Sequence, residues 1–255
     1  MAIIANVEMP VFRWRQLVKM MYPLCIEFAM DISVENIRIR LVDPAHVELL
    51  VLDLHPGLFT VFTVNEPVRI GWDLDKLKDA LKYLDGNDVF SLTVLDELYC
   101  DVAASFEFGV YRKHVRLIDV AGMPDPKIPY LDMKRVVQVD PRGLRTAVKK
   151  MTVSDHLSLE SRGVSLIVGC KGDEDNEEIR LEVLNPLGRR GKRYRSLFSL
   201  DYITGIVESV PKSMSELTMR LGTDNPVELK YVEKDREDHP VMEALYLLAP
   251  RIESE

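Results

Sequence analysis

One phrase of the sequence occurs twice, and this repeat limits the fold more than any other feature of the chain. Leu-Asp-Lys-Leu at residues 74–77 matches Leu-Asp-Tyr-Ile at 200–203, an offset of 126 residues. Each copy begins an apolar-periodic segment typical of a short helix. Each then passes through a turn, DGND (85–88) or PKSMS (211–215), into alternating strand residues. The period is too long for a solenoid repeat, so it indicates a duplicated domain.

A second pair of segments follows the same order. The helix-like residues 11–23 precede the strand-like residues 35–54, and 140–151 precede the strand-like 163–170 and 178–184. The order helix, strands, helix, strands occurs twice, which predicts an α+β fold with duplicated domains and mostly antiparallel sheet. We expect an N-terminal domain at 1–116, a connector at 117–133 and a C-terminal domain at 134–255, because the prolines of the connector disfavour both helix and sheet ladder.

Several functional classes find no support in the residues. Cys25, Cys100 and Cys170 are scattered and odd in number, which argues against a disulfide framework or a thiolate zinc site and is typical of a reducing cell interior. The histidines show no HxH or HExxH spacing, and Ser-Asp-His at 154–156 are neighbours, whereas a catalytic triad is assembled in space. We expect no metal, no cofactor and no enzymatic activity. The sequence has no apolar run of the ~18–20 residues that a membrane span needs and no signal peptide, so we expect a soluble intracellular protein.

Basic residues gather on predicted helices although the net charge is −8. Arg15 and Lys19 are four residues apart in the first segment, as are Lys78 and Lys82 in the second. Such like-charged pairs cost about 0.2–0.5 kcal/mol each, so their repetition indicates a polyanionic partner, with a merely solvated helix face as the alternative. The fourth helix, 200–210, carries acids instead. The basic loop before it, Arg189 to Arg195, lacks the spacing of a phosphate-binding P-loop.

Two strand-like segments carry opposite charge. Residues 110–117 are basic and residues 173–183 are acidic. If each is an edge strand, head-to-tail pairing joins opposite charges and can close a ring, while two unrelated surface strands are the alternative. The candidate interface residues are Arg112, Lys113, Arg116, Glu174, Glu177, Glu178 and Glu182.

Four phrases resemble the proliferating cell nuclear antigen (PCNA) family of DNA sliding clamps, most closely its archaeal members. They are LVDPAHVELLVLDL (41–54), IGWDLDKLKDALK (70–82), SLDYITGIV (199–207) and LYLLAPRIESE (245–255), and the resemblance extends over roughly residues 7–253. It implies a ring of three subunits with two similar domains each, strands outside and helices lining a hole for duplex DNA. It implies a polymerase processivity factor with no enzymatic activity, in the cytoplasmic nucleoid if the source is archaeal and in the nucleus if it is eukaryotic.

The resemblance also implies site residues and partners. The partners are duplex DNA without sequence preference, DNA polymerase, flap endonuclease, DNA ligase, an ATP-driven clamp loader and two further copies of a clamp subunit. The DNA-binding candidates are Arg13, Arg15, Lys19, Lys76, Lys78, Lys82, Arg142, Arg145, Lys149 and Lys150. The partner-peptide pocket would comprise Val42, His46, Leu49, Val120, Met123, Ile128, Pro226, Leu247, Ala249, Pro250 and Arg251. A checkpoint-type clamp, a subunit of a heterotrimer and a DNA-independent scaffold of the same fold stay open as alternatives.

Overall fold

The computed structural model describes residues 3–188 and 193–251, and the chain forms two compact units. Unit 1 consists of Met1–Pro44, Leu50–Pro126 and Lys234–Glu243, and unit 2 consists of Ala45–Leu49, Lys127–Glu233 and Ala244–Glu255. The main boundary falls inside the predicted connector. Two short segments, 45–49 and 234–243, belong to the opposite unit from the chain around them.

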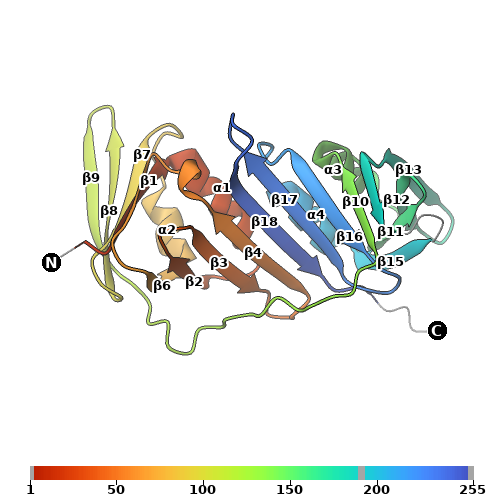
Figure 1. Cartoon of the computed structure of the whole chain (residues 1–255), viewed down its shortest axis with the longest axis horizontal. Helices are drawn as coiled ribbons and strands as arrows, with labels where there is room; N and C mark the ends of the chain where they lie inside the picture. The colour runs from red at the N-terminus through yellow and green to blue at the C-terminus, as the bar shows by residue number, and fades with distance from the viewer. Residues whose placement is uncertain (1–2, 189–192, 252–255) are drawn as a thin grey trace. The chain divides into compact units, whose positions relative to one another are not determined.

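Unit 1 contains two helices and two groups of antiparallel strands (Figure 1). One group is a five-stranded sheet in the order β5-β1-β7-β8-β9, and the other has the order β6-β2-β3-β4. Its helices are α1 (Val11–Met21) and α2 (Leu74–Ala80), with a 3₁₀ turn at Pro56–Leu58. The strands are β1 (Ala5–Pro10), β2 (Glu27–Ile32), β3 (Ile37–Val42), β4 (Glu48–Leu54), β5 (Val61–Val64), β6 (Val68–Asp73), β7 (Val89–Val94), β8 (Tyr99–Phe106) and β9 (Gly109–Arg116).

Unit 2 repeats this plan, which confirms the predicted duplication and the α+β class. Its strands form a group in the order β13-β12-β11-β15 and another in the order β14-β10-β16-β17-β18. Its helices are α3 (Pro141–Lys150) and α4 (Leu200–Ser209). The strands are β10 (Arg135–Val139), β11 (His156–Arg162), β12 (Ser165–Lys171), β13 (Asn176–Glu182), β14 (Asn185–Gly188), β15 (Tyr194–Ser199), β16 (Glu216–Leu221), β17 (Val227–Lys234) and β18 (Pro240–Leu248).

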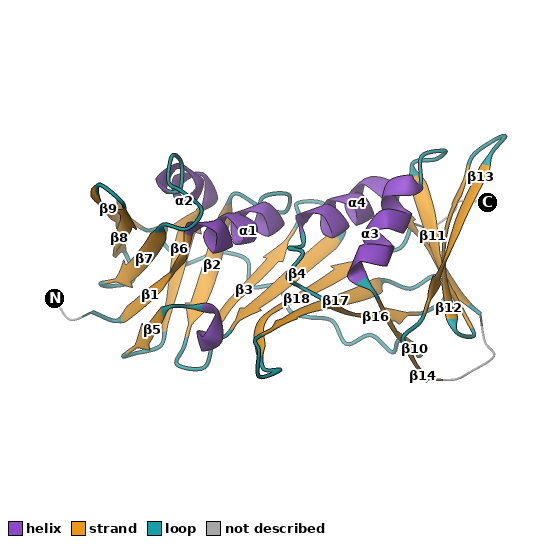
Figure 2. Cartoon of the chain, turned by 90° about the horizontal axis from the view of Figure 1, so that it is seen from above, coloured by secondary structure: helices purple, strands orange, loops and turns teal. Residues whose placement is uncertain are grey.

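Both helices of each unit lie on the same side of that unit's strands (Figure 2). Their apolar stripes, spaced at the helical period, are buried as predicted. In α1 the stripe comprises Val11, Trp14, Val18 and Met21, and in α3 with its C-cap it comprises Leu144, Ala147, Val148 and Met151. The basic residues of these helices therefore face away from the core. None of the helices in the described ranges is long and apolar enough to cross a membrane.

The second helix is shorter than the sequence indicated. The apolar period of its segment continues to Leu84, but α2 ends at Ala80. Tyr83 has a φ of 66°, a left-handed conformation that stops a helix and that residues with a Cβ seldom adopt. Lys82 consequently lies in the turn after the helix and not on its ridge.

Trp14 joins α1 to the sheet beneath it. The side chain is 2% exposed, its indole Nε1 donates a hydrogen bond of 3.2 Å to the Phe90 carbonyl, and the two rings meet edge to face at 5.6 Å. Phe90 belongs to β7, whose alternating residues are buried as predicted. This contact fixes the helix on the strand that follows α2 in the chain.

We expect Trp14→Ala to lower the free energy of unfolding by about 3–5 kcal/mol, because it leaves a large cavity in the core. Denaturant unfolding followed by circular dichroism measures the change. Phe12→Ala is the matched control, since Phe12 lies on the same helix but is 39% exposed. Equal losses in the two variants would contradict the assigned role of Trp14.

Candidate nucleic-acid interface and partner pocket

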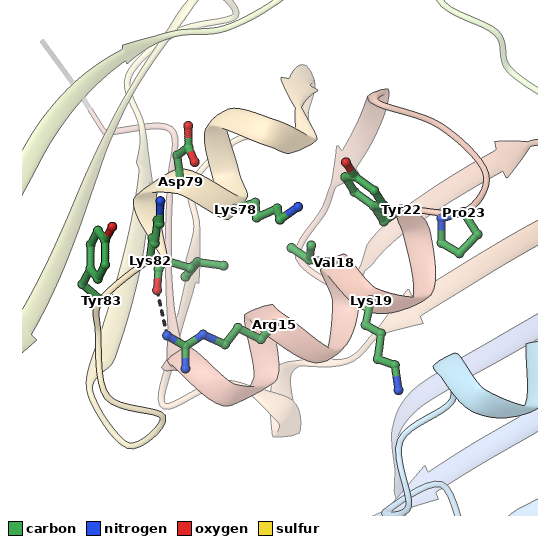
Figure 3. Close-up of a pocket in the computed structure, with 10 residues that line it drawn as sticks. Arg15, Val18, Lys19, Tyr22, Pro23, Lys78, Asp79, Lys82 and Tyr83 are labelled. Carbon is green, nitrogen blue, oxygen red and sulfur yellow. Dashed lines mark hydrogen bonds between the residues drawn. The ribbon is translucent and has the colours of Figure 1, made fainter. Parts of the chain in front are cut away.

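A cleft of about 710 Å³ lies between α1 and α2 (Figure 3). We call it the α1–α2 cleft. It is lined by Arg15, Val18, Lys19, Tyr22, Pro23, Lys78, Asp79, Leu81, Lys82 and Tyr83. Four of the predicted DNA-binding residues are thus brought together, and Asp79 is the one acid among the described lining residues. A cleft with four cations and one acid attracts anions.

Two lysines of the cleft stand over aromatic rings. The Lys78 Nζ atom lies 4.4 Å from the centre of the Tyr22 ring, and the Lys82 Nζ atom lies 5.0 Å from that of Tyr83. Figure 3 shows Lys78 extending from α2 toward Tyr22 at the end of α1. Such cation–π contacts contribute about 0.5–1 kcal/mol at exposed sites, so they hold the ammonium groups in place without neutralising them.

Arg15 and Arg145 each make hydrogen bonds within their own unit, a role that the sequence did not predict. Nη2 of Arg15 donates to the carbonyls of Leu81 and Leu84, at 2.9 and 2.8 Å (the first bond is drawn in Figure 3). Arg145 donates in the same way from Nε to Val207 and from Nη2 to Val210, at 2.6 and 2.5 Å. Each guanidinium satisfies carbonyls that the end of the unit's second helix leaves unpaired.

The cations of α3 are largely paired within unit 2. Arg142 makes two hydrogen bonds to Asp140, at 3.1 and 2.7 Å, and this contact lowers the pKa of Asp140. Lys149 forms an ion pair of 2.7 Å with Glu208 of α4. Lys150 is exposed and makes no ion pair with any residue in the described ranges. Unit 2 therefore offers less unpaired positive charge on its helices than its sequence indicated.

The remaining basic candidates lie outside both arrangements. Lys76 is exposed on α2, while Arg13 is half-buried and its Nη1 approaches Gln16 Oε1 at 3.4 Å. In the basic loop, Arg189, Arg190 and Lys192 lie outside the described residues. Arg193 is paired with Glu160 at 2.7 Å, so part of this loop's charge is neutralised locally.

Arg145→Met should lower the free energy of unfolding by about 1–3 kcal/mol, because it keeps the apolar stem but leaves two carbonyls without a charged donor. Urea unfolding of the two variants measures this. The control Lys150→Met, on the same helix, should change stability by less than about 0.5 kcal/mol. If Arg145→Met proved as stable as the control, the role of Arg145 in capping would be refuted.

The predicted partner pocket begins with the connector, which is fastened to unit 1 at two places. The Ile118 amide donates to the Gly71 carbonyl at 2.9 Å, and a Cβ added at Gly71 would collide with the Ile118 carbonyl oxygen. Further on, Arg40 binds Asp125 at 2.9 Å. Glycine at position 71 thus allows the connector to lie directly against β6.

A small cavity of about 40 Å³ lies under this strap. Val42 of β3 and Met123 of the connector, both predicted pocket residues, line it together with Phe28 and Leu41. Val120 is half-buried nearby in the chain, and Ile128 is 48% exposed. The apolar side chains that β3 and the connector contribute to this cavity suit contact with an apolar side chain of a partner.

The other predicted pocket residues belong to unit 2. The Ala249 amide donates to the Val47 carbonyl at 2.9 Å, which places the chain end beside the segment of His46. His46 is exposed, while Pro226 and Pro250 are half-buried. Leu49 and Leu247 are only 9% and 5% exposed, so little of their side chains is open to a partner in this structure.

The C-terminal segment is held by Arg251. Its amide donates to the Leu197 carbonyl at 2.7 Å, and its guanidinium binds Asp155 at 2.7 Å. Ser154 and Asp155 both contact the same nitrogen, Nδ1 of His156, at 2.9 and 2.8 Å. A catalytic triad needs the serine and the carboxylate on different ring nitrogens, so these three residues form no triad.

The pKa of Asp155 is lowered to about 2, first by the hydrogen bond from His156 and second by that from Arg251. Because the folded pKa lies below the ordinary value of about 3.9, the stabilising contribution is complete above that value and is lost as the pH falls through about 2. Arg251→Ala should raise the pKa of Asp155, as followed by the carboxyl ¹³C shift in an NMR titration. Arg236→Ala, at a different exposed arginine, should leave it unchanged. An unaltered pKa in Arg251→Ala would show that the arginine does not hold the carboxylate.

The predicted interface strands both lie at sheet edges. β9 ends the five-stranded sheet of unit 1, and β13 ends the four-stranded sheet of unit 2. On β9 only Val115 is buried, so Arg112, Lys113 and Arg116 are exposed. Glu174, Glu178 and Glu182 are exposed at or beside β13. Glu177 is hydrogen-bonded within unit 2, where its carboxylate accepts hydrogen bonds from Thr152 and Val153.

Comparison with known proteins gives a consistent set of relatives. No family model matches the sequence. The chain is 32% identical to the DNA polymerase sliding clamp of Methanosarcina mazei over 90% of this chain and 91% of the relative. It is 30% identical to that of Methanococcoides burtonii over 88% and 89%, and 31% identical to that of Archaeoglobus fulgidus over 85% of each.

Solved structures give the same picture. The chain is similar to A. fulgidus PCNA bound to the C-terminal region of FEN-1, with a TM-score of 0.82, 27% identity and coverage of 98% of this chain and 100% of that one. It is similar in fold to PCNA from Thermococcus kodakaraensis, with a TM-score of 0.84, 24% identity and coverage of 97% and 100%. The likeness extends over both units.

Proposed function

The chain belongs to the family of DNA polymerase sliding clamps, and we propose that three copies form a ring that encircles duplex DNA and holds replication and repair proteins on it. A clamp supplies processivity and is not an enzyme. A closed ring leaves DNA slowly even when each contact with the duplex is weak. The observation that carries the proposal is the arrangement of helices over sheet: each unit buries the apolar stripe of its helices and turns their basic residues outward.

Duplex DNA fits these basic residues. It carries one negative charge per ~1.7 Å of helix axis, and contacts with phosphates position a protein without reading the sequence. The exposed lysines at 76, 78, 82 and 150 are point charges on flexible stems, which suits contacts that form and break as the ring slides.

Ring closure is supported by the two edge strands. β9 carries three exposed basic candidates, and β13 with the turn before it carries exposed acidic ones. Pairing β9 of one copy with β13 of the next would satisfy both edges and join opposite charges head to tail. Such a heterologous contact closes a ring when the rotation per subunit divides the circle evenly. In a ring of three, the three contacts would use every β9 edge and every β13 edge.

Partner peptides would bind where the connector crosses unit 1. The cavity lined by Val42 and Met123 is small, and the connector above it is fixed at Ile118 and Asp125. An incoming apolar side chain would enlarge the cavity by displacing the flexible Met123 side chain. Flap endonuclease, DNA polymerase, DNA ligase and a clamp loader are the proposed partners, in the intracellular location expected from the sequence. The FEN-1 complex of the A. fulgidus relative supports the first.

The decisive experiment is topological. Protein loaded onto a nicked circular DNA should remain bound through gel filtration and should be released when a restriction enzyme linearises the circle. Light scattering should give about three times the chain mass of 29.2 kDa. A mass of two chains, or equal retention on circular and linear DNA, would favour the DNA-independent scaffold.

The charge contribution is tested with Lys78→Glu/Lys150→Glu, which should shorten retention on the circle several-fold and make it less dependent on salt, because fewer phosphates are neutralised and fewer counterions are released. Arg236→Glu/Lys127→Glu makes the same change in net charge at exposed residues outside the helices and should retain normally. If both double variants behaved alike, the helix faces would have no special role.

A further inference from the structure

We infer that the α1–α2 cleft binds an unpaired nucleotide of DNA, with its base against Tyr22 and its phosphate on Lys78 and its basic neighbours. The assignment rests on the proposed function, because only a clamp around DNA brings this cleft next to a nucleic-acid strand. Contacts with a duplex need only surface charge, and nothing in duplex binding requires a cavity.

The cleft has the two parts that a nucleotide requires. Its volume of about 710 Å³ lies within the range of about 300–1,000 Å³ typical of small-ligand sites. Val18, Pro23 and Leu81 give it an apolar floor, and Tyr22 is 45% exposed at its edge. Aromatic rings beside a basic groove are the usual platform for single-stranded nucleic acid, because every base has a face that can stack.

The position of Lys78 connects the two parts. Its ammonium group lies over one face of the Tyr22 ring, 4.4 Å from the ring centre, so it is within reach of the phosphate of a base stacked on the opposite face. Lys82 stands in the same relation to Tyr83, which is 90% exposed. A tyrosine at a φ of 66° is strained where glycine would fit, and such strain is commonly kept at binding sites.

Unit 2 lacks the two tyrosines of this site at the matching positions. Arg15 and Arg145 are 130 residues apart and cap in the same way, and the same offset places Thr152 opposite Tyr22. The offset of 126 between the second helices places Ser209 opposite Tyr83, and Ser209 is buried with its hydroxyl on the Ile206 carbonyl. Lys149 is neutralised by Glu208. The cleft is therefore a property of the first copy and not of the duplicated fold.

Methyl NMR on the full chain tests the inference, with Val18 and Leu81 in the cleft floor as reporters. Tetrathymidylate should shift both methyl signals, and a twelve-base-pair duplex at equal phosphate concentration should leave them nearly unshifted. Tyr22→Leu, which keeps apolar bulk, should weaken tetrathymidylate binding at least about fivefold, the low end of a base stacked on an aromatic ring. Tyr130→Leu is the matched control, since Tyr130 is 95% exposed on the connector, and should bind normally.

Three results would overturn the inference: unaltered affinity in Tyr22→Leu, equal shifts with the duplex, or equal affinity for tetraglutamate, which would make the cleft a general anion site. Tyr83→Gly suits the backbone and should fold, and it should also weaken binding. A loss of trimer mass in that variant would instead assign Tyr83 to a contact between copies and remove it from the site. Retention on circular DNA distinguishes failure of this inference from failure of the proposed clamp function. If tetrathymidylate does not bind but the Tyr22→Leu protein is still retained on the circle, only the nucleotide site is refuted.

Discussion

The burial of one apolar stripe on each long basic helix is the interaction on which the rest of the structure depends. In α1, Trp14 and its neighbours enter the core, and the 3.6-residue period then leaves Arg15 and Lys19 no position except the opposite side. The same constraint acts on α3. A chain with a net charge of −8 can in this way present locally positive surfaces, because burial and not average composition decides where each charge lies.

The two units share the residues that hold each of them together and differ in the charged residues on their helices. The arginine that caps the second helix is present in both copies, as Arg15 and Arg145, and it makes equivalent bonds in each. The residues around it differ, since Lys149 is paired with Glu208 whereas Lys78 lies against Tyr22. Two helix pairs with one architecture thus have different electrostatic surfaces, and a partner that passes both meets more unpaired charge on the first.

The sequence predicted the fold well and the site only in part. Periodicity was sufficient for the stripes of α1 and α3 and for the alternating β7 and β16, because one face of each element is buried and the other is not. It says nothing about β18, where Tyr246, Leu247 and Leu248 are all buried, because alternation carries no information where both faces of a strand are covered. The capping role of Arg15 and Arg145 could not be predicted, because an arginine that caps a neighbouring helix and one that contacts phosphates occupy the same kind of position in the sequence pattern. Their equivalent placement in both copies was the one signal that they belong to the fold.

Arginines and lysines have different roles on these helices, and the difference follows from the shapes of their charged groups. A guanidinium is a rigid planar fork, and here Arg15, Arg145 and Arg142 each use it on two fixed acceptors within their own unit. An ammonium is a compact charge on a flexible stem, and lysines supply the positive charge that stays available on α2 and at the end of α3. Directional, two-pronged contacts would hold a ring at one place on DNA. Interchangeable point charges attract the duplex equally at every position. A clamp that must move along DNA is therefore better served by arginines that bind within its own structure and by lysines that contact the DNA.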